Sequence, residues 1–385
     1  MVCSRPGPSD AARSSAAGLF PNELLLDGAN FPAIVYWRPP AGTNPTVIFL
    51  PGGGHLARVA YGHPGAHAPD FVDFWLREVG WGLLAISYPS DHSAFSKVYP
   101  DMTVSDWGAS VADIAVDLLA DRAAPHQIIV AGWSMAGRAA RSVCNELTRV
   151  GLPPVGFISL AASAPFPGLV PVLEKGEPLT EAGLWDLAAS EFGLPSRETK
   201  WCAELAVQSA ENGREVIPVE IYKRDYRANT PLLLRGEPQF VRTSGAVQSV
   251  AEVAQELGTF DYASHPLTGV IAPTKPSDAR HALTDALTWG FLNAQQLFEH
   301  LVKGGRDLSA ISPERWERLR LLMLDLPQRL TRTVAGGHFF FIGALGAEAT
   351  ARLLIDLSRD IASLQAEISA LISEAPQLSS SASDQ

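Results

Sequence analysis

Short apolar runs rich in Val and Ile recur along the chain, and most have the length of buried strands. They lie at Ala33–Trp37, Thr46–Leu50, Gly82–Ser87, Gln127–Ala131, Val155–Ala161, Leu267–Ala272 and Leu330–Val334. Segments with helical spacing of apolar residues separate the early runs, at Pro69–Val79, Val104–Asp121 and Met135–Arg149. Strands that alternate with helices are typical of a mainly parallel sheet covered on both faces, so we predict the α/β class.

The alternation breaks between about residue 165 and residue 265. Helical spacing there, at Leu179–Phe192, Ser196–Asn212 and Gly245–Leu257, predicts a largely helical cap inserted into the fold. A second helical insertion is expected over roughly Asp278–Leu324, and a terminal helix near Ala347–Ile372. We therefore predict an α/β core of residues 19–165 and 266–376, a cap of residues 166–265, and disordered tails at residues 1–18 and 377–385.

Composition narrows the class of protein and of partner. The chain has 385 residues, of which 46% are hydrophobic and 18% charged, and this excludes a disordered chain or a coiled-coil rod. Lys and Arg number 30 against 41 Asp and Glu, a net charge of −11. An acidic chain has no general attraction to nucleic acid or anionic membranes, so we expect a small-molecule substrate as the partner, and a neutral one fits better. The oligomeric state stays open.

The lack of a secretory signal segment and the spacing of the cysteines both bear on the cellular compartment. The three cysteines, Cys3, Cys144 and Cys202, lie far apart without metal-ligand spacing, so we expect neither a disulfide framework nor a metal site. Residues 1–18 lack the apolar segment of a secretory signal, and no stretch approaches the roughly 18 apolar residues of a membrane span. We therefore expect a cytoplasmic protein.

The most informative stretch runs from an apolar strand through Gly132-Trp-Ser-Met-Ala136 into a helix. A hydroxyl at such a sharp turn is pushed clear of the backbone, and the positions two before and two after it must be small. Gly132 and Ala136 satisfy that limit, and the N-terminus of the helix favours negative charge beside Ser134. We predict that Ser134 is a nucleophile. The same pattern occurs around Ser110, but no strand precedes it, so we assign Ser110 no role.

A glycine-rich loop and a histidine turn supply the partners that such a nucleophile needs. The strand Thr46–Leu50 ends in Pro51-Gly-Gly-Gly-His55, where backbone N–H groups can approach a ligand with no side chain in the way. We expect the N–H of Gly53, with Gly54 as the near alternative, to form an oxyanion hole with the N–H of Met135. His338 follows a late strand through a Gly-Gly turn, which predicts a general base at the same sheet edge.

The acid that orients this histidine is expected after the strand that precedes it in the sheet. Asp278 stands at the end of the loop that follows Leu267–Ala272. Asp285 and Asp307, in the same insertion, are the alternatives. The chain order Ser, Asp, His is that expected of one particular fold.

These three motifs are similar to those of the α/β-hydrolase superfamily. The resemblance rests on Pro51-Gly-Gly-Gly-His55, Gly132-Trp-Ser-Met-Ala-Gly137 and Gly336-Gly-His-Phe-Phe340, and covers about residues 46–165 and 266–345. It implies an α/β-hydrolase fold in which Ser134 is acylated, His338 carries the proton and Asp278 holds the imidazole, without metal or organic cofactor. Gly54, His55 and Trp133 would be possible pocket residues, although we treat His55 as structural. The triple glycine also resembles the loop of esterases that accept bulky esters.

Substrate choice would be decided by the cap and the second insertion. Their aromatic residues favour an apolar or bulky substrate wherever some of them face the cleft: Trp185, Phe192, Trp201, Tyr222, Tyr226, Trp289, Phe291 and Trp316. The leading hypothesis is a serine hydrolase of carboxylic esters. The same machinery would also serve a thioesterase, a lactonase, an amidase, an acyltransferase or a carbon–carbon bond hydrolase, and the rival of another class is a non-catalytic protein that binds a small ligand.

Overall fold

A computed structural model describes residues 18–119, 127–169, 177–190, 194–238, 248–303 and 307–372. The predicted tails, apart from Gly18, lie outside the described residues, as does Phe192 of the expected cap. The predicted division into core and cap stays a prediction.

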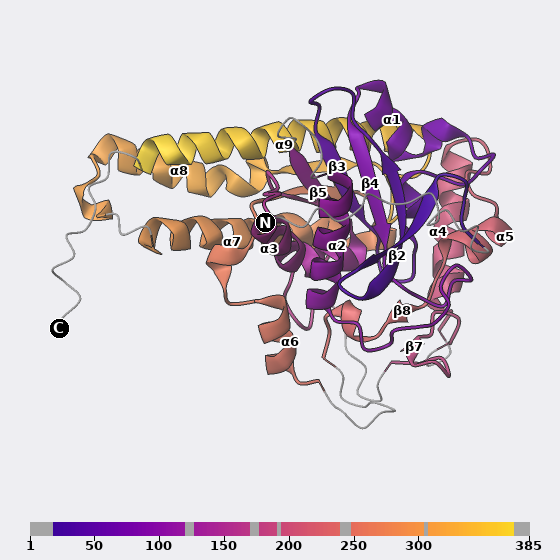
Figure 1. Ribbon diagram of the computed structural model, residues 1–385. Coiled ribbons are helices and arrows are strands. Elements are labelled where there is room, and N and C mark those ends of the chain that lie inside the picture. The colour runs from indigo at the N-terminus through magenta and orange to yellow at the C-terminus, as the bar shows by residue number, and fades with distance from the viewer. Residues whose placement is uncertain are drawn as a thin grey trace, which may run out of the picture.

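An eight-stranded sheet forms the centre of the molecule (Figure 1). Its strands are, in spatial order, β1 (Glu23–Gly28), β2 (Phe31–Arg38), β4 (Gly82–Ser87), β3 (Thr46–Leu50), β5 (Ile128–Trp133), β6 (Phe157–Leu160), β9 (Thr268–Pro273) and β10 (Thr331–Val334). Within this sheet β2 alone runs against the others, because it pairs antiparallel with both β1 and β4. This strand order with one reversed strand is the α/β-hydrolase fold, which confirms the predicted fold class.

Side chains alternate between the two faces of the sheet, and each face has its own apolar core. In β3, Val47 and Phe49 belong to one core and Ile48 and Leu50 to the other. Helices α1 (Val72–Glu78) and α9 (Ala344–Ile372) cover the first face, and α2 (Val104–Leu119) and α3 (Ala140–Arg149) cover the second. A sheet buried on both faces explains why the central strands read as continuous apolar runs.

The chain between β6 and β9 is only partly helical in its described residues. It contains β7 (Leu184–Trp185), α4 (Arg197–Glu211), α5 (Val219–Ile221), β8 (Thr230–Pro231) and α6 (Val250–Leu257). The helix expected over Leu179–Phe192 is wrong for the residues described there, because Leu184 and Trp185 pair antiparallel with β8. Gly183, at a φ of 80°, closes a turn just before this strand. Strand pairing at long range overrides the local helical spacing.

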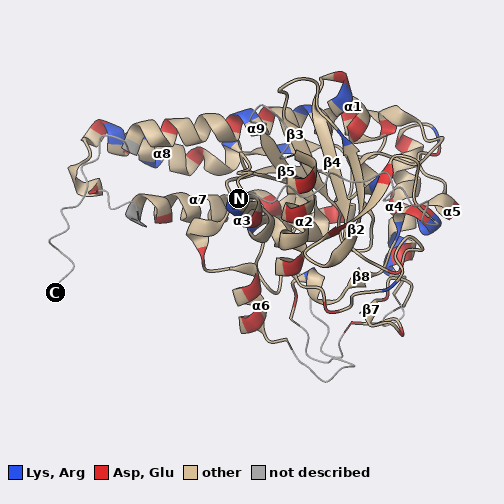
Figure 2. Ribbon diagram, in the orientation of Figure 1, with Lys and Arg blue, Asp and Glu red and all other residues tan. Residues whose placement is uncertain are grey.

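Three long helices project together to one side of the sheet (Figure 1). They are α7 (Ala279–Lys303), α8 (Pro313–Arg329) and α9. The second helical insertion and the terminal helix expected from the sequence are therefore present. None of the described helices combines the length and the apolar character needed to cross a bilayer. Figure 2 shows acidic segments on α2, on α6 and on the long helices, so the negative charge is spread over several elements.

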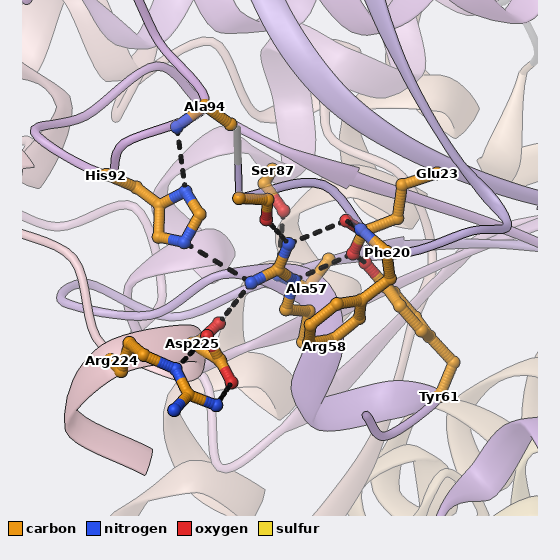
Figure 3. A network of polar contacts seen from close by, with 11 residues as sticks. Phe20, Glu23, Ala57, Arg58, Tyr61, Ser87, His92, Ala94, Arg224 and Asp225 are labelled. Carbon is orange, nitrogen blue, oxygen red and sulfur yellow. Dashed lines mark hydrogen bonds and ion pairs between the residues drawn. The ribbon is translucent and has the colours of Figure 1, made fainter. Parts of the chain in front are cut away.

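A buried ionic network ties the start of the sheet to the loop after β3. The guanidinium of Arg58 donates to both carboxylate oxygens of Glu23, over 2.7 and 2.6 Å, and to the backbone oxygen of Asp225 over 2.8 Å (Figure 3). It also donates to Nε2 of His92 over 3.3 Å. The side chains of Arg58 and Glu23 are fully buried. The network joins three segments around the glycine-rich loop that precedes Arg58.

Candidate active site

Ser134 stands at the turn where β5 passes into a 310 turn, Ser134–Ala139. Its φ is 56°, a left-handed backbone conformation that a residue with a side chain adopts only when its surroundings impose it. A Cβ at Gly132 would lie 2.5 Å from the ring of Phe157 and 3.2 Å from the Cβ of Ala136. Small residues on both sides of Ser134 are therefore a packing requirement of this turn.

His338 reaches Ser134 from the loop after β10. Its Nε2 lies 2.9 Å from the Oγ of Ser134. The indole Nε1 of Trp133 donates to the backbone oxygen of His338 over 3.1 Å, so the residue before Ser134 also holds the histidine loop. The side chain of His338 is 16% exposed, which leaves it open to a molecule in the neighbouring cavity.

Asp278 completes a hydrogen-bonded chain of three residues. Its Oδ2 accepts from Nδ1 of His338 over 2.7 Å, so the free lone pair of the imidazole is on Nε2 and faces Ser134. The loop after β9 is held in place because Thr274 and Lys275 both donate backbone N–H bonds to Gly336. Burial raises the pKa of Asp278, but the charge and the hydrogen bond of His338 outweigh it and leave that pKa below its ordinary value.

The two alternative acids lie elsewhere. Asp285 bonds to Nδ1 of His281 over 2.9 Å, and Asp307 caps a short turn by accepting from Ser309. Of the three candidates from the sequence, Asp278 is therefore the one that the structure brings to His338.

The glycine loop lies against the turn that carries Ser134. A Cβ at Gly52 would be 2.8 Å from the Cβ of Ser134, so only a residue without a side chain allows this approach. The N–H of Gly54 donates to the hydroxyls of Tyr88 and Thr230, over 2.9 and 2.6 Å, and is not available to a ligand.

Two amides beside Ser134 point to an anion site. No hydrogen bond within the described part of the chain occupies the N–H of Gly53. Met135 stands in the first turn of its helix, where N–H groups lack partners within the helix. Both residues line the cavity beside Ser134. The expected pair of Gly53 and Met135 is thus compatible with this arrangement, whereas the alternative, Gly54, is not.

Gly54, His55 and Trp133 were named as possible pocket residues, and that is wrong for all three, whereas the structural role preferred for His55 agrees with its position. All three are buried behind the cavity wall and none lines it. His55 donates from Nδ1 to the backbone oxygen of Gly53 over 3.1 Å and accepts from the hydroxyl of Tyr222 over 2.7 Å. Burial lowers the pKa of His55 to about 3, so it is a neutral support of the glycine loop.

A cavity of about 320 Å³ opens next to Ser134 and His338. Its apolar wall consists of Gly53, Met135, Trp185 and Trp201. The remaining lining residues are polar or charged: Ser134, Arg138, Ser163, Arg197, Lys200, Glu204, Arg235, Glu237, Ser277, Asp278, Arg280, His281 and His338. Among the described aromatic residues expected to shape a pocket, Trp185 and Trp201 do so, while Tyr222, Tyr226 and Trp289 belong to the buried core.

Sequence reasoning missed a second histidine–aspartate pair beside the first. The ring of His281 lies 5.4 Å from that of His338, centroid to centroid, and both His281 and Asp285 are buried. Their spacing of four residues within one helix was the available signal.

Ligand atoms of Asp278, His281 and His338 lie within 4.8 Å of one another, a spacing that could suit a metal ion. Both ring nitrogens of His281 are already hydrogen-bonded, to Asp285 and to the cationic Arg280, and Nδ1 of His338 is bonded to Asp278. These contacts leave few lone pairs for an ion, and the guanidinium would repel one. The donor set does not favour a metal centre.

No family model matches the chain, and no curated protein matches its sequence. Solved structures with a similar fold include a thermophilic esterase from Thermogutta terrifontis, with 12% identity over 88% of this chain and 98% of that chain at a TM-score of 0.44. A thioesterase domain from the curacin biosynthetic pathway has 12% identity over 86% of this chain and 98% of that chain, at a TM-score of 0.43. A bacterial heroin esterase has 14% identity over 91% of this chain and 87% of that chain, at a TM-score of 0.42. Identities and TM-scores this low carry no information on what this chain acts on.

Proposed function

We propose that this protein is a serine hydrolase that cleaves a carboxylic ester through an acyl-enzyme intermediate. The single observation that carries the proposal is the hydrogen-bonded chain from Ser134 through His338 to Asp278, over 2.9 and 2.7 Å, at the wall of a cavity. A nucleophile, a base in contact with it and a third group that orients the base are the elements of nucleophilic acyl transfer.

In this proposal, His338 takes the proton of Ser134 as its Oγ attacks the ester carbonyl. The oxyanion that forms accepts hydrogen bonds from the amides of Gly53 and Met135. His338 then gives the proton to the departing alcohol, which leaves the acyl group on Ser134. Water, deprotonated by His338, attacks the acyl carbonyl. His338 then returns this proton to Oγ of Ser134 as the bond to the acyl group breaks and the carboxylic acid leaves. Asp278 keeps Nε2 of the imidazole facing Ser134 throughout.

The proposal also specifies the type of bond that is cleaved, a carboxylic ester, and the molecule that accepts the acyl group, water. A thioesterase, a lactonase, an amidase, an acyltransferase or a carbon–carbon bond hydrolase would use the same residues. Trp185 and Trp201 in the wall fit the bulky substrate expected from the sequence. The many charged residues of the same wall do not fit a wholly apolar one.

The first test removes the proposed nucleophile, Ser134, and uses as its control Ser110, which stands in the same local sequence pattern. Ser134→Ala is expected to lower ester turnover by about 10⁴-fold or more and to abolish labelling by a fluorophosphonate probe, because no other group replaces the serine hydroxyl. Ser110→Ala removes a buried serine of α2 in the same local pattern and should change neither readout. Turnover of p-nitrophenyl acetate and identification of the labelled peptide measure both effects.

Turnover that persists in Ser134→Ala, or a label on another residue, would contradict the proposal. Binding of a small molecule at one site per chain, without product after long incubation of the unaltered protein, would favour the rival interpretation of a non-catalytic binding protein.

A further inference from the structure

The cavity beside Ser134 carries a charge balance opposite to that of the whole chain. Its cationic residues are Arg138, Arg197, Lys200, Arg235 and Arg280, and its carboxylates are Glu204, Glu237 and Asp278. The chain as a whole has 30 basic and 41 acidic residues. Cations therefore outnumber carboxylates in the cavity that adjoins the proposed nucleophile.

Several of these charges already have partners. Arg138 forms a buried ion pair with Glu237, and Arg235 pairs with Glu177 over 2.7 Å while its guanidinium lies 4.2 Å from the ring of Trp185. Asp278 is bonded to His338. Arg280 and Lys200 differ, because neither forms an ion pair with the described residues of the chain.

Arg280 is held from behind by two buried residues. Its Nη2 donates to Nε2 of His281 over 2.5 Å, and Nδ1 of His281 donates to the carboxylate of Asp285 over 2.9 Å. This assignment of donors is the consistent one, since a guanidinium only donates and an ionised carboxylate only accepts. His281 is 1% exposed and Asp285 is 3% exposed. Burial lowers the pKa of His281, in keeping with a neutral ring that accepts from Arg280.

The guanidinium of Arg280, held in place by His281 and Asp285, is suited to binding a carboxylate. Its planar set of N–H donors matches a carboxylate in two parallel hydrogen bonds, and less rotamer entropy is lost when the group is already oriented. Arg280 lines the same cavity as Ser134 and follows Asp278 by two residues, so a ligand that it holds lies close to the reacting hydroxyl. Lys200, on α4, adds a second positive charge to the cavity wall.

We propose that the substrates are esters that also carry a carboxylate, which Arg280 binds with support from Lys200. The inference rests on the proposed function and names its substrate class. Arg280 determines specificity, and His281 with Asp285 acts as a positioning pair that holds the guanidinium toward the cavity.

The competing explanation is that Arg280 only stabilises the ionised form of Asp278, because its charge lowers the pKa of that carboxyl. In that case loss of Arg280 would slow the hydrolysis of all esters by the same factor. If Arg280 binds substrate, loss of its charge affects charged esters more than neutral ones. The ratio between the two is therefore the decisive measurement.

The experiment uses two matched ester pairs with the full chain. Monomethyl and dimethyl glutarate place the carboxylate on the acyl side, and 4-acetoxybenzoate and its methyl ester place it on the alcohol side. We expect kcat/KM for the charged member to exceed that for the neutral member at least tenfold in one pair. Arg280→Gln should lower this ratio about 10- to 100-fold, since it removes a charge-assisted contact, and Lys200→Met should lower it less. Lys97→Met, at a lysine that lies over Tyr99 outside the cavity, is the matched control and should keep the ratio.

The positioning pair is tested by the same ratio. His281→Phe and Asp285→Asn should each lower it, and Arg280→Lys should retain part of it. Preference of the unaltered protein for neutral esters, or an equal loss for both members in Arg280→Gln, would overturn the proposal.

A binding arm separates failure of this inference from failure of the proposed function. If no ester is hydrolysed, the hydrolase assignment fails, and calorimetry then measures binding of glutarate and of glutaramide to the protein. Glutarate binding that exceeds glutaramide binding and falls at least tenfold in Arg280→Gln upholds the anion site. Equal or absent binding of both refutes it.

Discussion

At the scale of single residues, the site depends on groups that hold the backbone as much as on groups that would react. The φ of 56° at Ser134 places its hydroxyl outside the turn, and the small residues around it are dictated by contacts such as that of Gly132 with Phe157. The hydroxyl of Tyr88 has a comparable part in the glycine loop. It donates to the backbone oxygen of Gly52 over 3.0 Å and accepts from the N–H of Gly54 over 2.9 Å.

Tyr88→Phe is therefore expected to loosen the loop that presents the amide of Gly53. We expect kcat for a neutral ester to fall about tenfold with a smaller change in KM, because the contact with the oxyanion strengthens in the transition state. The fluorophosphonate should still label Ser134. Tyr99→Phe, at a tyrosine whose ring contacts Phe31 and Lys97, is the control. An unchanged kcat in Tyr88→Phe would show that the loop does not need this hydroxyl.

The chemistry-bearing residues were predictable to the extent that local sequence specifies them. Ser134, His338 and Asp278 each follow a strand through a turn, and such positions can be read from hydrophobic runs and small residues. His281 and Arg280 carry no such mark, since inside a helix their neighbours across space decide what they do. The same reason explains why Trp133 was named as a possible pocket residue and lies behind the cavity wall.

At the scale of elements, apolar runs predict the central strands because those strands are buried on both faces. The edge strand β1 was missed, since it is only partly buried and begins with an acidic residue, Glu23. The burial of Glu23 makes sense only together with Arg58, which lies 35 residues away in the chain. Pairing of β7 with β8 was missed for the same reason, because the partners are distant in sequence.

The Arg58 network makes a stability prediction at this scale. Arg58→Met leaves the buried carboxylate of Glu23 without its cationic partner and should lower the free energy of unfolding by about 3–5 kcal/mol. Arg58→Met combined with Glu23→Leu should recover part of that loss, because no uncompensated charge remains. Urea unfolding at pH 7.5 measures both, with the exposed pair partner Arg77→Met as control. A loss in Arg58→Met no larger than that in the control would contradict this account.

At the scale of the whole molecule, buried neutral histidines make stability depend on pH. Burial lowers the pKa of His55 to about 3, and burial followed by the charge of Arg58 lowers that of His92 to about 4. The unfolded chain binds protons at these residues below a pH of about 6.5, whereas the folded chain does not until far lower pH. Stability is therefore expected to fall as the pH drops below about 6.5.

This pH dependence can be measured by urea unfolding at pH 7.5 and pH 5. Each of the two histidines should lower the free energy of unfolding by about 2 kcal/mol at pH 5, from 1.36 kcal/mol per pH unit. His92→Gln removes one of the groups and should show a correspondingly smaller difference between the two pH values. Equal stability of the unaltered protein at both values would mean that these histidines are charged in the folded state.

The start of α7 carries both the residue that orients His338 and the residue proposed to bind the substrate. Asp278 directly precedes this helix, and Arg280, His281 and Asp285 occupy its first two turns. Any redesign that slides or tilts α7 to fit a longer ligand would also move the carboxylate that aligns the imidazole, so selectivity and turnover cannot be retuned independently from this side. Lys200 belongs to α4, which carries none of the three reacting groups, and an engineer who wants a different substrate should begin there.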